Sequence, residues 1–264
     1  MKLNINTYFG YSKYLGTEKF AKEISKTIKK GKNGYAGWKK REWLEYNLRF
    51  NSKKGEKEFQ GIENLGEKCE KIIKDTVGKV KRFLPGEIFF YVFPTPYSEV
   101  LAKMGGSSGS TIWKDTVYVY IFPEGKWEES LQSTVIHELT HIITGYHYGN
   151  DFPLGECLIH EGLAENFRGS ILGGSEPWTR AISKKKSQEI LSKLKSSLDI
   201  KPSRKKYSDL FFGTGNYPHW AGYTIGYNLV KDYLKRKYPN GKIDWKEVFE
   251  MKPKNILMEA LKVI

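Results

Sequence analysis

The stretch from Thr134 to His147 reads TVIHELTHIITGYH and contains the pattern HExxH at His137, Glu138 and His141. On an α-helix, residues four apart differ by about 40° of rotation and about 6 Å of rise, so both imidazoles project from one helix face. Two histidines in this arrangement can bind one metal ion. Glu138 stands beside that face, where its carboxylate can reach a water in the open fourth position of a zinc ion and act as a general base. The stretch therefore predicts a helix that carries part of a zinc hydrolase site.

The residues around this pattern support a helical context. Apolar residues recur at helical spacing over Trp127 to Tyr146, which predicts one helix through the pattern. Before it, residues 111–113 and 116–122 read as two short strands, and the second is apolar throughout, as expected for a strand covered on both faces. The glycine- and serine-rich residues 105–110 are predicted as a turn or mobile loop, and their glycines do not match a phosphate-binding pattern.

The first hundred residues predict helices and one buried strand. Residues 64–84 carry an apolar residue every three or four positions, the stripe of an amphipathic helix. Residues 87–93, EIFFYVF, are β-branched and aromatic enough for a buried strand. Earlier in the chain, residues 18–30 predict a short polar helix, and the aromatic-rich residues 35–50 are interpreted as packing onto a core.

The second half of the chain is predicted to be mainly helical. Helices are expected over residues 154–172, which contain IHEGLAENF, over residues 217–238 and over residues 248–263. Between them, residues 180–206 hold ten basic and two acidic side chains. We interpret that segment as a basic helix and turn that face solvent.

A catalytic zinc ion takes three protein ligands and leaves one position for water, so the two histidines need a third partner. His147 is one candidate, because it lies ten residues after His137 in the spacing of the pattern HExxHxxGxxH. That pattern needs a glycine at position 144 to turn the chain out of the helix, but Thr144 stands there and Gly145 comes one place late. His147 is therefore kept as an alternative ligand, together with His160.

Glu161 is the stronger candidate. It lies twenty residues after His141 on the next predicted helix, in the string EGLAE. Glu161 and Glu165 are four residues apart and face the same side of that helix, and the apolar residues between them favour a buried face. A metal-bound imidazole also needs a carboxylate or carbonyl on its other nitrogen. We therefore expect Glu161 to be the third ligand and Glu165 to hold one of the ligand histidines.

Three ordered motifs resemble a known group of proteins. The strings HELTH (137–141), EGLAE (161–165) and WAGYTIGYNLVKDYL (220–234) resemble the YjaZ-type family of predicted bacterial zinc-dependent proteases. The first two are similar to the gluzincin arrangement of thermolysin-type metalloproteases. The resemblance covers about residues 110–250 and implies a Zn²⁺ cofactor. It implies metal ligation by His137, His141 and Glu161, and the role of general base for Glu138.

A peptidase also needs a donor for the oxyanion of the tetrahedral intermediate, and such donors contribute roughly 3 kcal/mol where they have been removed. Tyr223, His219 and Tyr227 are the candidates in the third motif. Tyr223 and Tyr227 are four residues apart and can share a helix face, whereas His219 precedes them near the start of the predicted helix. We rank Tyr223 first and keep His219 as a further catalytic candidate.

The predicted fold is α+β, a zincin-like metalloprotease domain with a small mixed sheet and a mainly helical C-terminal half. We expect a single domain over residues 1–264, with residues 1–100 as an N-terminal layer and residues 110–250 as the catalytic part. The predicted function is zinc-dependent hydrolysis of peptide bonds, with the substrate strand laid along an exposed sheet edge at Ser110 to Trp113. The alternatives are a zinc hydrolase of non-protein amides, and a basic nucleic-acid-binding or regulatory protein whose HExxH site is vestigial.

Composition limits these alternatives. The net charge of +14 would attract any polyanion. The lysines are spread along the chain, however, and no zinc knuckle or RNA-recognition signature is present, so nucleic acid is not the expected partner. Cys69 and Cys157 are too few for a disulfide framework and are expected to be free thiols in a reducing compartment. The sequence shows no signal-peptide core and no membrane span, so we expect a cytoplasmic protein; it does not predict an oligomeric state.

Overall fold

The structure is a computed structural model of the 264-residue chain. It describes residues 1–10, 22, 62, 64–95, 102–123, 125–147 and 151–262. The predicted aromatic stretch at residues 35–50 lies outside these ranges, as does the predicted helix at residues 18–30 except for Lys22. The chain divides into two compact units, residues 1–139 and residues 140–264, and the division falls inside a helix. The prediction of a single domain stays a prediction.

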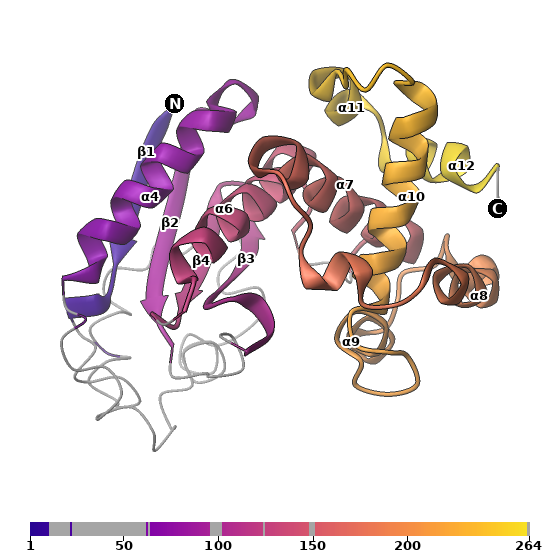
Figure 1. Ribbon diagram of the computed structural model, residues 1–264, viewed down its shortest axis with the longest axis horizontal. Coiled ribbons are helices and arrows are strands. Elements are labelled where there is room, and N and C mark those ends of the chain that lie inside the picture. Colours follow the sequence, from indigo (N-terminus) through magenta and orange to yellow (C-terminus); the bar gives the residue numbers. More distant parts are fainter. Residues whose placement is uncertain are drawn as a thin grey trace. The chain divides into compact units, whose positions relative to one another are not determined.

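The first unit contains a mixed four-stranded sheet with the order β1-β2-β4-β3 (Figure 1). Its strands are β1 (Lys2–Thr7), β2 (Glu87–Pro94), β3 (Ser107–Trp113) and β4 (Thr116–Ile121). The first, second and fourth strands run parallel, and β3 pairs antiparallel with β4 at the edge of the sheet. The two central strands are almost wholly buried because their residues after Glu87 and Thr116 are apolar. The predicted small mixed sheet is therefore confirmed.

Strand β3 corrects one sequence interpretation. Its pairing with β4 extends back to Ser107 opposite Ile121, so the prediction of a loop over residues 105–110 is wrong from Ser107 onward. The turn is confined to Gly105 and Gly106, whose φ angles are 72° and 101°. Serine and glycine have low strand propensity, and tertiary packing decides the conformation here. The side chain of Ser107, for example, donates a hydrogen bond of 3.1 Å to Thr134 Oγ1.

Two helices lie on one face of this sheet, α4 (Leu65–Val80) and α6 (Trp127–Thr144) (Figure 1). Helix α4 continues into the short 3₁₀ helix η2 (Lys81–Phe83), so the helix predicted over residues 64–84 is confirmed. An ion pair between Lys68 and Glu128 joins the two helices. Helix α6 ends at Thr144 because Gly145 adopts a left-handed φ of 72°.

Two helices of the second unit, α7 (Leu154–Leu172) and α10 (Ala221–Lys237), lie side by side (Figure 1). A pair of glycines allows their backbones to touch. A Cβ atom on Gly162 would lie 2.2 Å from the carbonyl oxygen of Gly226, and one on Gly226 would lie 2.1 Å from the carbonyl oxygen of Leu158. No side chain fits at either position, so the crossing requires glycine on both helices.

Helix α10 begins later than predicted, and the last predicted helix is divided. Trp220 adopts a left-handed φ of 62°, so the helix expected over residues 217–238 starts only at Ala221. The single helix expected over residues 248–263 is wrong, because α11 (Trp245–Glu250) and α12 (Pro253–Leu261) occupy this region. Pro253 starts the second helix, since proline lacks the N–H group that a continuous helix would need there.

The basic segment forms two helices, α8 (Lys184–Leu194) and α9 (Arg204–Phe212). The 3₁₀ helix η4 (Pro177–Arg180) precedes them and η5 (Lys195–Ser197) lies between them. The lysines of α8 are exposed, while Ile190, Leu191 and Leu194 form its buried side. Among the residues that the structure describes, no helix is long and apolar enough to cross a membrane.

Both cysteines are free thiols, as predicted, and both are buried. Burial raises the pKa of the Cys69 thiol to about 12, and it has the same effect on the Cys157 thiol. The Cys157 thiol donates a 3.5 Å hydrogen bond to the carbonyl oxygen of Phe152. Both side chains therefore act as small apolar groups of the core at neutral pH.

The glycine crossing generates a prediction about stability. Gly226→Ala is expected to lower the free energy of unfolding by about 3 kcal/mol, because the new methyl group overlaps a backbone carbonyl and the two helices must separate. Gly78→Ala in α4 is the matched control, since a Cβ atom there meets nothing within 4 Å. The free energy of unfolding of this control should equal that of the wild type or exceed it by up to about 1 kcal/mol, because alanine has a higher helix propensity than glycine. Urea unfolding measures both changes; equal stability of Gly226→Ala and the wild type would contradict the contact.

Candidate metal centre

His137 and His141 lie one turn apart on helix α6, as the HExxH pattern predicts. The boundary between the two compact units falls between Leu139 and Thr140, but the helix continues through it and fixes the spacing of the two histidines. Most of the surrounding helix is buried, and His141 itself is only 5% exposed. A buried imidazole needs a polar partner or a metal ion, because it has lost its hydrogen bonds with water.

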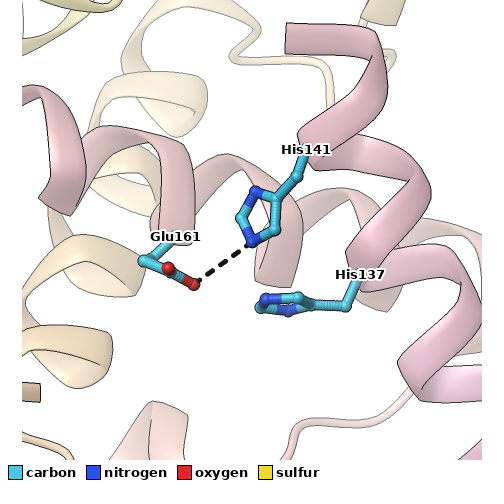
Figure 2. A group of neighbouring side chains, drawn as sticks. All are labelled: His137, His141 and Glu161. Carbon is cyan, nitrogen blue, oxygen red and sulfur yellow. Dashed lines mark ion pairs between the residues drawn. The ribbon is translucent and has the colours of Figure 1, made fainter. Parts of the chain in front are cut away.

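Glu161 supplies that partner from helix α7. Glu161 is 3% exposed, and its Oε2 lies 3.5 Å from His141 Nε2. The ligand atoms of His137, His141 and Glu161 all lie within 4.8 Å of one another. Figure 2 shows the two imidazoles and the carboxylate directed toward a common space. Two imidazole nitrogens and one carboxylate oxygen form a donor set that fits a catalytic zinc ion.

The two alternative ligands occupy other positions. His147 follows the turn at Gly145, and its Nδ1 lies 3.0 Å from the Gly145 carbonyl oxygen. His160 is buried, with Nδ1 3.1 Å from Thr144 Oγ1 and its ring stacked on Tyr146 at a centroid distance of 4.5 Å. Burial, followed by the neighbouring His141, lowers the pKa of His160 to about 3. In the described part of the chain, the group that could hold a metal ion includes neither residue.

Two tyrosines beside this group were missed by the sequence analysis. The hydroxyl groups of Tyr146 and Tyr207 lie 3.2 Å apart, and the Tyr146 ring lies 4.9 Å from the His141 ring. Burial raises the pKa of Tyr207 well above its usual range, and the negative charge of Glu161 raises it further. A hydrogen bond with Glu161 contributes in the same direction, so Tyr207 is a neutral hydroxyl beside the Glu161 carboxylate.

A signal for Tyr207 is present in the sequence. Tyr207, Leu210 and Phe211 follow the spacing of one helix face, and the last two are fully buried. The predicted solvent-facing segment ends at residue 206, directly before this short apolar face, and no helix was predicted over residues 207–212. The hydroxyl group of Tyr207 therefore comes from a part of the chain to which the sequence assigned no role.

Glu138 is 5% exposed and contacts strand β3. The hydroxyl group of Thr111 lies 2.8 Å from Glu138 Oε2 and 2.9 Å from the Glu138 carbonyl oxygen, so its single proton is within hydrogen-bond distance of both acceptors. The carboxylate is therefore held by the sheet while its helix carries the two histidines. Its role as general base stays a prediction.

The three candidate oxyanion donors occupy different surroundings in the second unit. His219 is exposed, with Nδ1 2.8 Å from the Phe212 carbonyl oxygen. Tyr223 is half-buried and packs edge-on against Phe211 at 5.3 Å. Tyr227 is also half-buried, and the Lys231 ammonium group lies 5.2 Å from the centre of its ring. Their catalytic roles stay predictions.

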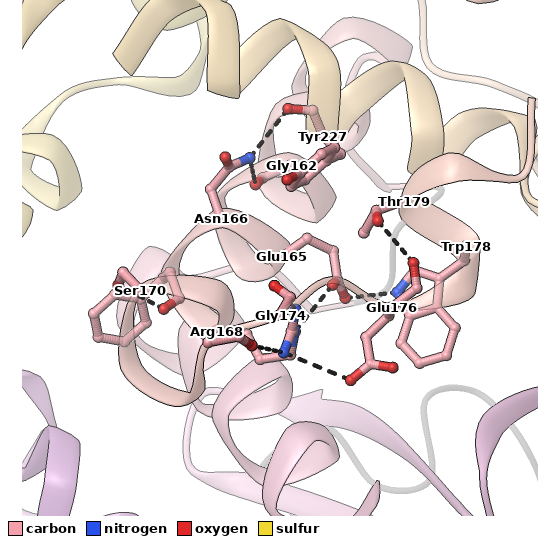
Figure 3. Close-up of polar contacts among 12 residues, drawn as sticks. Gly162, Glu165, Asn166, Arg168, Ser170, Gly174, Glu176, Trp178, Thr179 and Tyr227 are labelled. Carbon is pink, nitrogen blue, oxygen red and sulfur yellow. Dashed lines mark hydrogen bonds and ion pairs between the residues drawn. The ribbon is translucent and has the colours of Figure 1, made fainter. Parts of the chain in front are cut away.

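Glu165 lies in a buried polar network in the second half of α7 (Figure 3). Its Oε1 accepts a 2.7 Å hydrogen bond from Trp178 Nε1, and its Oε2 accepts one of 3.3 Å from Arg168 Nε. Arg168 also donates to the carbonyl oxygens of Gly173 and Gly174, each at 3.2 Å. These contacts join α7 to η4 and give Glu165 a structural function. Its expected role behind a ligand histidine stays a prediction.

The network leads to a test that separates these two roles. Glu165→Gln is expected to lower the free energy of unfolding by about 3 kcal/mol, because Arg168 loses the charge that compensates its burial. Metal content should stay at the wild-type value if the role is structural. Glu176→Gln is the matched control, since this residue meets the same arginine at 3.6 Å but is 23% exposed, and it should cost less than about 1 kcal/mol. Loss of metal with unchanged stability would support the histidine-orienting role instead.

Comparison with known proteins agrees with the chemistry of this site. The model of a family described as "Predicted Zn-dependent protease (DUF2268)" matches residues 64–258. The "Uncharacterized protein YjaZ" of Bacillus subtilis (strain 168) is 28% identical over 135 residues, which make up 49% of this chain and 51% of that protein. The chain thus spans about half the length of this relative. No solved structure gives a significant match, so the zincin-like fold stays a prediction.

Proposed function

The chain belongs to the family of predicted Zn-dependent proteases, and we propose that it is a zinc-dependent peptidase with a zincin-like fold. One observation carries the proposal: the ligand atoms of His137, His141 and Glu161 lie within 4.8 Å of one another. Two histidines from one helix and a glutamate from the next correspond to the gluzincin arrangement that the sequence predicts. The family description supports zinc-dependent chemistry, and the donor geometry supports these three residues as the ligands.

The burial of these groups favours a bound cation. The side chains of His141 and Glu161 are 6% and 5% exposed, and an ionised carboxylate at that depth is costly unless positive charge compensates it. Catalytic zinc sites commonly take two histidines and one glutamate and keep one position open. Zinc held there would act as a Lewis acid and lower the pKa of a water molecule toward about 7.

Glu138 is assigned the proton transfers. Its carboxylate accepts a proton from the water whose oxygen attacks the peptide carbonyl carbon, so that a carbon–oxygen bond forms. The same group then donates this proton to the amide nitrogen as the carbon–nitrogen bond breaks. Such general acid–base catalysis contributes about 10²- to 10⁴-fold. Tyr223, with His219 as the alternative, is proposed to donate a hydrogen bond to the oxyanion.

An extended peptide is the proposed substrate class. Strand β3 lies at the edge of the sheet, and β4 is its only partner among the described strands. Edge strands present backbone donors and acceptors to which an extended chain can add as a further strand. The segment from Ser110 to Trp113 is proposed to receive it. Recognition through the backbone would make cleavage depend more on an extended conformation than on one particular side chain.

Metal analysis of protein purified without chelator tests the ligand assignment. The wild type and Glu138→Gln are expected to hold about one zinc ion per chain, because the base is not a ligand, whereas Glu161→Ala loses it. Glu129→Gln is the control, since this glutamate is 73% exposed on the same helix. Equal zinc content in the wild type and Glu161→Ala would overturn the assignment.

Activity is tested on a library of unstructured peptides. The wild type should cleave them, lose cleavage on chelation and regain it when zinc is added back. Glu138→Gln should be at least about 10²-fold slower, and Glu129→Gln should be unchanged. Zinc-dependent hydrolysis of non-protein amides without peptide cleavage would refute the substrate class. Salt-sensitive nucleic-acid binding without any hydrolysis would refute the enzyme proposal.

A further inference from the structure

Strand β3 and helix α6 of the first unit touch along a line of small and polar residues, here named the β3–α6 seam. Every second residue of the strand meets every fourth residue of the helix, because two strand residues rise about 6.7 Å and four helical residues about 6 Å. The near match keeps the two elements in register over two helical turns. The seam consists of Ser107, Gly109 and Thr111 on the strand and Ser130, Thr134 and Glu138 on the helix.

Gly109 brings the strand directly onto the side chain of Glu138. A Cβ atom at Gly109 would lie 2.6 Å from Glu138 Cγ and 2.7 Å from Thr134 Cγ2, so no larger residue fits without displacing them. The backbone of β3 therefore covers the aliphatic part of the glutamate. This close approach restricts the rotamers open to Glu138 on that side.

Thr111 holds the end of the same side chain. Its hydroxyl group lies 2.8 Å from Glu138 Oε2, and the two residues are 8% and 5% exposed. Threonine is stiff at χ1 because it is β-branched, so its hydroxyl direction is largely fixed by the backbone. The pairing of β3 with β4 shifts register between Thr111 and Trp113, and such irregularities redirect side chains next to functional sites.

We propose that Thr111 is a positioning residue for Glu138. Its hydroxyl group fixes Oε2, so that Oε1 is directed to the water from which the glutamate takes its proton. This inference rests on the proposed function of Glu138 as general base. Thr111 does not itself touch the reacting atoms. The rival explanation is that Thr111 only attaches the edge strand to the helix.

Four variants separate positioning from attachment. Thr111→Val keeps the shape and removes the hydroxyl group, and Thr111→Ser keeps the hydroxyl group and removes the methyl group. Ser107→Ala is the matched control, because it removes another buried seam hydrogen bond, to Thr134, one helical turn from the glutamate. If Thr111→Val does not fold, Thr111→Ala removes the hydroxyl group without adding a methyl group at its place. Zinc content and urea unfolding are measured for each variant before kinetics.

For Thr111→Val we expect kcat on a fluorogenic peptide to fall about 10- to 100-fold, with KM within about twofold and zinc content unchanged. Thr111→Ser should recover kcat to within about fivefold of the wild type. Ser107→Ala should lower the urea midpoint as Thr111→Val does but keep the wild-type kcat. A wild-type kcat in Thr111→Val, equal impairment in Thr111→Ser, or equal impairment in Ser107→Ala would each overturn the positioning role.

A second readout does not depend on peptidase activity. In crystals of zinc-loaded Thr111→Val, the Glu138 carboxylate should leave its wild-type position, whereas in Ser107→Ala it should remain there. An unmoved carboxylate in Thr111→Val would overturn the proposal even if kcat falls. If the wild type cleaves no peptide, the proposed function fails, while the carboxylate position still decides whether Thr111 holds Glu138.

Discussion

The burial of the Glu161 carboxylate against the His141 imidazole is the interaction on which the site depends. Burying an isolated ionised carboxylate at this depth destabilises the folded state by far more than one ion pair stabilises it. The surroundings must therefore supply hydrogen bonds and positive charge. Tyr207 provides a neutral hydroxyl group beside Glu161, and its raised pKa keeps it protonated at neutral pH. Helix α7 can present this glutamate only because its own position is tightly fixed.

Two features of the second unit fix α7. Near its middle, Gly162 and Gly226 allow the backbones of α7 and α10 to touch, which leaves no room for sliding or side-chain rearrangement. In its second half, the buried pair of Glu165 and Arg168 joins the helix to Trp178 in η4. Glu161 lies next to the glycine contact, and Glu165 follows one turn later. The EGLAE string thus combines a candidate ligand, a packing contact and a structural ion pair in five residues.

Sequence patterns predicted the parts of the site that depend on local spacing. The one-turn separation of His137 and His141 follows from helix geometry, and the EGLAE string singled out Glu161 as a candidate ligand, which lies beside the two histidines in the structure. The start of strand β3 at Ser107 could not be predicted in this way. Serine and glycine have low strand propensity, and the strand forms here because these small residues pack against α6. The contacts of Glu165 also escaped prediction, since Trp178 lies thirteen residues away beyond a turn that spacing rules do not describe.

The two buried cysteines have a consequence for the inorganic chemistry of the protein. Zinc binds thiolates, not thiols, so a free cysteine competes for the metal only where its thiol can lose the proton. Burial raises the pKa of both Cys69 and Cys157 to about 12, so each sulfur keeps its proton at the pH of ordinary purification. Sulfur of the folded chain therefore competes little for an incoming metal ion, which leaves nitrogen and oxygen atoms such as those of His137, His141 and Glu161 as the available donors.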